Sequence, residues 1–237
     1  FKMKSVERNF IIALVGLAIV EYLLSSFPTI GFFVYAVFVG LILILMENEV
    51  KHTKEEKLLI ILMILPICRI AEIFLNLEFF WSTLVFYLFI ICVTLYYVIK
   101  FWLRFEKTPF IGNPTYFFGA LGISGIAWAV SKYLFNWEFS GIVFLIPLIA
   151  YAEEIYFRGT FQNLANEWFG NFSILLTAFV YNIFSISYGF TYVLIAFSAA
   201  LILSSLYHIT KNIYISYVLN IIFHVLLFMF YPVVYGI

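Results

Sequence analysis

The chain has 237 residues, of which 65% are hydrophobic and 11% are charged, and its formal net charge is zero. Soluble domains carry about 25% charged residues, so a surface that faces water over most of its area is excluded. The neutral balance gives no indication of a nucleic-acid partner. All thirteen acidic residues are glutamates, which excludes an intramembrane protease built on two aspartates.

Apolar runs follow one another along the chain, each close to the roughly 20 residues that a helix needs to cross a membrane. They are continuous rather than alternating, so a membrane β-barrel is excluded. We expect an all-α polytopic membrane protein, a helical bundle of about eight or nine transmembrane helices. The candidate spans are 10–27, 30–46, 58–77, 79–99, 117–135, 140–159, 172–190, 193–209 and 214–234.

The first run follows Lys2, Lys4 and Arg8, as the apolar part of a signal peptide does. No small-residue cleavage pattern comes after it and Glu21 interrupts it, so we interpret it as an uncleaved first span. With the N-terminus in the cytoplasm, eleven of the thirteen basic residues fall on the cytoplasmic side. We therefore expect an integral protein of the cell membrane, surrounded by membrane lipids, with a cytoplasmic N-terminus.

Residues 100–116 mix aromatic and basic side chains and contain Pro109 and Pro114. This composition is typical of a segment that lies along the lipid headgroups. It predicts a division into a four-span N-terminal membrane segment, residues 1–116, and a second membrane segment, residues 117–237.

Charged groups inside a span each cost on the order of 2.5 to 3.5 kcal/mol, so each needs a partner or a function. Arg69 and Glu72 stand three positions apart on one helical face and can neutralise each other. Glu21 has no such neighbour, and the sequence leaves its role open. Cys68 and Cys92 lie in apolar runs, where we expect them buried as small apolar side chains.

The most informative polar cluster is the string EEIYFRG, which begins with Glu153 and Glu154. Glu154 and Arg158, four positions apart, can pair on one helical face, whereas Glu153 projects about 100° away. Glu153 must then be matched from another helix, held protonated, or placed against water in a cavity. The last two environments suit a general base that activates water.

Asn220 and His224 also lie four positions apart, so an amide and an imidazole point from one face of the last span. They can serve chemistry at a site inside the bundle, or form a hydrogen-bonding pair between helices without chemistry. His208 stands at the cytoplasmic end of its span, where placement at the membrane interface explains it.

The string EEIYFRG at residues 153–159 resembles the first motif of the CPBP family, which comprises CAAX prenyl proteases and bacteriocin-processing proteases and is also called the Abi family. The resemblance covers about residues 140–228. Further matches follow in the family's order, at residues 169–170 (FG), at residues 210–214 (TKNIY) and at the pair Asn220 and His224.

This resemblance implies an intramembrane endopeptidase in which Glu153 activates a water molecule, Glu154 is its neighbour and Arg158 is structural. In the family, later helices supply two histidines and an Asn or Asp around the site. Asn220 and His224 are then the candidate catalytic residues from the last span.

The later motifs depart from the family's pattern. The second motif, Phe-x-x-x-His, falls where this chain has Ser185 and Tyr188 as candidate site-lining residues, and no histidine occurs in residues 159–207. The last motif, usually His-x-x-x-Asn, is reversed to Asn220-x-x-x-His224. Candidate donors for an oxyanion are therefore Asn220, His224 and Tyr188.

Two functions stay open: an endopeptidase that cleaves a membrane-anchored peptide or protein, and a non-catalytic member that binds or assembles a membrane protein partner. A rhomboid-like serine protease is less favoured, because the string GISG at residues 122–125 is common among packed membrane helices. A proton-coupled transporter using Glu21, Glu72 and Glu153 is also less favoured, because the sequence lacks paired half-helices broken by Gly or Pro.

No cofactor is expected, and we predict that the protein holds no tightly bound transition metal. A metal site needs about three protein ligands, whereas Glu153 and His224 supply two and His52 lies apart in a charged loop. Elemental analysis of purified protein dialysed against a chelator is expected to find no stoichiometric zinc. One zinc ion per chain would contradict this prediction.

Overall fold

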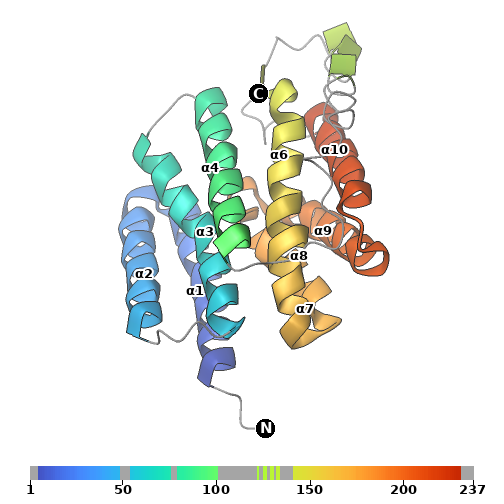
Figure 1. The fold of residues 1–237 in the computed structure, drawn as a ribbon. Coiled ribbons are helices and arrows are strands. Elements are labelled where there is room, and N and C mark those ends of the chain that lie inside the picture. Colours follow the sequence, from blue (N-terminus) through green and yellow to red (C-terminus); the bar gives the residue numbers. More distant parts are fainter. Residues whose placement is uncertain are drawn as a thin grey trace. The chain divides into compact units, whose positions relative to one another are not determined.

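The computed structural model describes residues 5–48, 54–75, 79–100 and 141–230, with isolated positions between 122 and 133. Nearly all of these residues are helical and none lies in a strand, so the all-α fold is confirmed for them (Figure 1). The serine of the GISG string, Ser124, lies outside the described residues, as does His52.

Three helical segments are long and apolar enough to cross a membrane by length and composition: Asn9–Ser26, Phe190–Thr210 and Ile213–Phe230. Shorter apolar helices cover Pro28–Ile44, Trp81–Tyr96 and Phe172–Ile183. These helices indicate an integral membrane protein in contact with lipids. The total of eight or nine spans stays a prediction.

The chain divides into two compact units, each built from two separate stretches of sequence. The first unit comprises residues 1–74 and 161–201, and the second comprises residues 75–160 and 202–237. The predicted division between residues 116 and 117 falls outside the described residues and stays a prediction.

The first unit begins with a tight helical hairpin of α1 (Ser5–Ser26) and α2 (Pro28–Asn48). Pro28 starts α2, because its fixed φ suits the first helical position and its missing N–H is not needed there. Gly31 faces the backbone of Leu24, which a side chain at this position would overlap. Glycine therefore allows the two helices to approach closely.

The same unit continues through α3 (Lys54–Leu75), α7 (Asn163–Phe169), α8 (Phe172–Ile183), the 3₁₀ turn η3 (Ile186–Tyr188) and the first part of α9 (Phe190–Thr210). Within it, α8 and η3 pack against α1, and α7 packs against α8. Gly170 ends α7 with a φ of 52°, a conformation that glycine adopts without strain.

A cluster of three charged side chains lies inside the first unit. Arg69 Nη1 lies 2.7 Å from Glu72 Oε2, so the pair expected from the sequence is present. Glu21 Oε1 lies 3.7 Å from Arg69 Nε, and its side chain is 1% exposed, against 26% for Arg69. One guanidinium thus balances two carboxylates, which come from α1 and α3.

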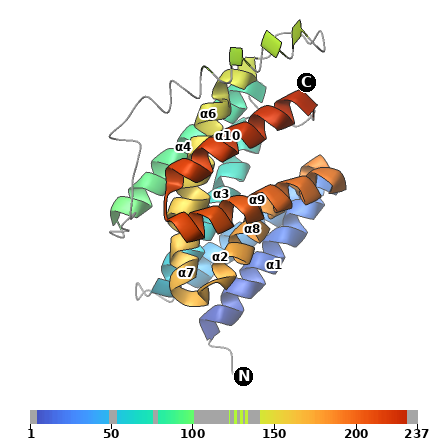
Figure 2. The same ribbon diagram turned by 90° about the vertical axis from the view of Figure 1, so that its right-hand side faces the viewer.

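The second unit contains α4 (Phe79–Lys100), the 3₁₀ segment η1 (Gly141–Leu145), α6 (Ile146–Glu153), most of the π-helix η2 (Glu154–Gln162), the last part of α9, and α10 (Ile213–Phe230). Within it, α6 packs against both α4 and α10, and Figure 2 shows α10 crossing α6.

Cys68 in the first unit is buried, but Cys92 on α4 is exposed, which corrects the expectation that both thiols are buried. The physical reason is that lipid tails are as apolar as a protein core. An apolar run in a membrane protein therefore does not have to face other helices, and its sequence does not say which side chains do.

A capped turn sets the start of α10. Lys211 has a φ of 50° and ends α9, with its N–H bonded to the Tyr207 carbonyl at 2.8 Å. Asn212 Oδ1 accepts the N–H of Tyr214 at 3.0 Å and so caps α10. The cap satisfies a backbone N–H in the first turn of α10, which has no partner within the helix.

We expect Arg69→Met to destabilise the protein, because it leaves Glu21 and Glu72 without their shared cation. Breaking a buried pair costs about 3 to 5 kcal/mol, and the partial exposure of Arg69 places the loss near the lower value. Thermal melting in one detergent checks this, and adding Glu21→Gln to the variant should recover part of the loss. An unchanged melting temperature in Arg69→Met would contradict the shared pairing.

Candidate active site

The two neighbouring glutamates stand where the helix changes type. The α-helix α6 ends at Glu153, and the π-helix η2 begins at Glu154. At the junction the N–H of Glu154 is shared between the carbonyls of Ala150 and Tyr151. π-Helical turns are rare and are frequent at functional sites.

The expected α-helical span over residues 140–159 is therefore corrected from Glu154 onward. Within the wider turn, Thr160 Oγ1 donates to the Ile155 carbonyl five residues earlier, at 2.9 Å. Hydrophobic periodicity carries no signal for this change, because it reports which faces of a helix are apolar and not which carbonyl each backbone N–H bonds.

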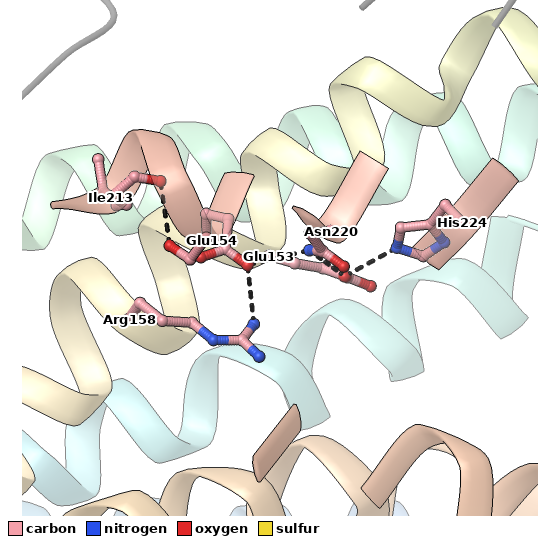
Figure 3. A network of polar contacts seen from close by, with 7 residues as sticks. Glu153, Glu154, Arg158, Ile213, Asn220 and His224 are labelled. Carbon is pink, nitrogen blue, oxygen red and sulfur yellow. Dashed lines mark hydrogen bonds and ion pairs between the residues drawn. The ribbon is translucent and has the colours of Figure 1, made fainter. Parts of the chain in front are cut away.

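Glu153 is matched from another helix, which is the first of the three environments that the sequence left open. Its Oε2 accepts a hydrogen bond from Asn220 Nδ2 at 3.0 Å and lies 2.9 Å from His224 Nε2 (Figure 3). Both partners lie on α10, and all three side chains are buried.

Glu154 pairs with Arg158 on its own helix, as the spacing predicts. Arg158 Nη1 lies 3.0 Å from Glu154 Oε1, and the two side chains are 0% and 1% exposed. The same carboxylate oxygen accepts a second bond from Asn220 Nδ2, at 3.0 Å. The wider π-turn thus still places residues 154 and 158 on one face.

The polar face of α10 extends beyond the predicted pair. Ser216 Oγ donates to the Ile213 carbonyl at 3.0 Å and is buried, and Tyr217 Oη donates to the Pro147 carbonyl at 3.3 Å. Sequence reasoning missed both residues. The signal for Ser216 was present, because positions 216, 220 and 224 form a polar stripe at a spacing of four on an otherwise apolar helix.

Other predicted site residues lie elsewhere in the chain. Ser185 and Tyr188 belong to the first unit, where Ser185 is buried and the Tyr188 ring packs edge-on against Tyr192 at 5.1 Å. His208 is half-buried in the last turn of α9. Their roles stay predictions.

The arrangement combines two carboxylates, one guanidinium, one amide and one imidazole in a buried place. A carboxylate in such surroundings can accept a proton, and a neighbouring imidazole can share it. Across the described part of the chain, no group of three or more His, Cys or Glu side chains is arranged to hold a metal ion. The chemistry that these residues themselves support is acid–base chemistry.

Comparison with known proteins identifies one related family. Residues 135–227 match the family described as Rce1-like, type II CAAX prenyl endopeptidase. No curated protein and no solved structure matches the chain significantly. The resemblance to CAAX proteases is thereby confirmed for a segment that contains Glu153, Asn220 and His224 with their neighbours.

Removing Arg158 should destabilise the second unit. Arg158→Ala leaves the Glu154 carboxylate buried without its cation, and breaking such a pair costs about 3 to 5 kcal/mol. We expect a lower yield and a lower melting temperature, and Glu154→Gln in the same chain should restore part of the stability. Melting at the wild-type temperature would speak against a structural role for Arg158.

Proposed function

We propose that this CAAX-protease-like membrane protein is an endopeptidase in which Glu153 activates a water molecule to cleave a peptide bond. The observation that supports this most is the placement of one Glu153 oxygen 3.0 Å from Asn220 Nδ2 and 2.9 Å from His224 Nε2. A carboxylate held by two side chains from a second helix is fixed in direction, which a general base requires.

In the proposed reaction, water bonded to Glu153 attacks the carbonyl carbon of the scissile bond and gives a proton to the carboxylate. A carbon–oxygen bond forms, and the carbonyl oxygen takes the negative charge. Collapse of this tetrahedral intermediate breaks the carbon–nitrogen bond, and the proton held at Glu153 passes to the leaving nitrogen. One water is consumed, and the carboxylate is regenerated.

His224 distinguishes this arrangement from a structural ion pair. With Glu153 ionised, as a general base requires, the hydrogen of the 2.9 Å contact lies on His224 Nε2. A partner such as Arg has donors only, whereas a neutral imidazole has one donor and one acceptor nitrogen. Glu153 can therefore pair with His224 across the two helices and still serve as a general base.

The proposed substrate is a membrane-anchored peptide or protein, because α6 and α10 hold the site in apolar surroundings. We further propose that the chain crosses the cell membrane about eight or nine times, as two membrane segments, residues 1–116 and 117–237. The distribution of basic residues supports a cytoplasmic N-terminus.

A non-catalytic role is the second candidate. The observation that favours it is the absence of histidine from residues 159–207, so the second motif of the family supplies no imidazole. In this alternative, Glu153, Asn220 and His224 form a buried hydrogen-bonded contact that fastens α10 to α6. The protein then binds or assembles a membrane protein partner.

Glu153→Gln separates the two functions, because it keeps the shape of the side chain and removes the base. We expect wild-type protein in liposomes to cleave membrane-anchored test peptides, and Glu153→Gln to be slower by about 100- to 10,000-fold. Glu167→Gln, the same change at an exposed residue of α7, is the matched control and should cleave like the wild type.

The contrary outcome is equally specific. If wild type shows no turnover, and wild type and Glu153→Gln both co-purify with one membrane protein partner, the endopeptidase is rejected in favour of the non-catalytic role. Turnover that survives Glu153→Gln would reject Glu153 as the base.

A further inference from the structure

Asn220 contacts both neighbouring carboxylates at once. Its Nδ2 donates to Glu153 Oε2 and to Glu154 Oε1, each at 3.0 Å. A primary amide nitrogen carries two hydrogens, so these two contacts engage both N–H bonds. The opposite orientation of the amide is excluded, because its oxygen would then face two carboxylate oxygens without a hydrogen between them.

The two carboxylates need a donor at this place. Glu153 and Glu154 are adjacent in the chain and both are buried, where like charges repel more strongly than in water. Arg158 and His224 each lie within 3.0 Å of one of these carboxylates, at the outer sides of the pair. The Asn220 amide lies between the two carboxylates and bonds to both, as Figure 3 shows.

We infer that Asn220 is a positioning residue that clamps Glu153 beside Glu154 and acts through these carboxylates rather than on the substrate. The inference rests on the proposed function and assigns a role within that site. With both N–H bonds engaged, the amide has none left for an oxyanion. Its Oδ1 is buried with no donor among the described residues, and as an acceptor it would repel an oxyanion.

A double-mutant cycle of Asn220→Ala and Glu154→Gln tests the clamp. Glu154→Gln removes one of the two like charges, so the clamp has less repulsion to overcome. In kcat/KM, the loss caused by Asn220→Ala should be at least about fivefold smaller in the Glu154→Gln background than in the wild type, since contacting residues couple to this extent. Equal losses in both backgrounds would overturn the inference, because an oxyanion donor acts independently of Glu154.

The same four proteins are compared by melting temperature, which requires no turnover. Asn220→Ala should lower the melting temperature less in the Glu154→Gln background than in the wild type. Asn212→Ala is the matched control: it removes the cap of α10 rather than a bond to a carboxylate, so its effect should be equal in both backgrounds. If Asn220→Ala does not fold, Asn220→Ser keeps one O–H donor, and the same cycle is expected with smaller losses.

The two readouts separate the inference from the proposed function. Coupled melting temperatures in a protein that shows no turnover would leave the clamp standing and reject the endopeptidase. Additive melting temperatures together with Glu153-dependent turnover would reject the clamp and leave the endopeptidase standing.

Discussion

The burial of two adjacent carboxylates is the constraint on which the second unit depends. Charges removed from water lose their hydration, and the loss is offset only if hydrogen-bond donors and opposite charges replace the solvent. The donors come from two directions, with Arg158 reaching back from η2 and a polar stripe reaching across from α10. The stripe lies on a helix whose first turn is capped by Asn212.

The two charged clusters described above, one in each unit, differ in the kind of partner they use. In the first unit, Glu21 and Glu72 form ion pairs with the guanidinium of Arg69, which does not release its proton under any ordinary condition. Around Glu153, the partners are an amide and an imidazole. The first arrangement joins α1 to α3 through a permanently charged group, whereas the second joins α6 to α10 through groups that can each accept or donate a hydrogen bond.

What the sequence predicted follows from local geometry. Helices were predictable because a chain in lipid must satisfy its backbone hydrogen bonds within each segment. Glu154 with Arg158, and Arg69 with Glu72, were predictable because residues three or four positions apart on a helix are neighbours. The shared face of Asn220 and His224 followed from the same spacing.

The features that the sequence could not predict depend on packing between helices or on backbone competition. That Asn220 and His224 reach Glu153, and that Glu21 reaches Arg69, depends on how helices distant in the sequence pack, which no spacing encodes. The exposure of Cys92 depends on the same packing. The π-helix depends on which carbonyl each backbone N–H bonds, and the pattern of apolar side chains does not predict that bonding.

Because η2 is a π-helix, the number of residues between Glu154 and Arg158 determines the backbone geometry there as much as their identity does. A helix with i→i+5 bonds accommodates more residues per turn than one with i→i+4 bonds, so it behaves like an α-helix that has absorbed an insertion. Deleting one residue between Glu154 and Arg158 would let the backbone return to α geometry and leave the guanidinium on nearly the same face, because residues three positions apart on an α-helix are still neighbours. A relative one residue shorter here would therefore carry its cation three positions after the glutamate instead of four, and an alignment without a gap across this stretch would pair side chains that do not occupy the same place.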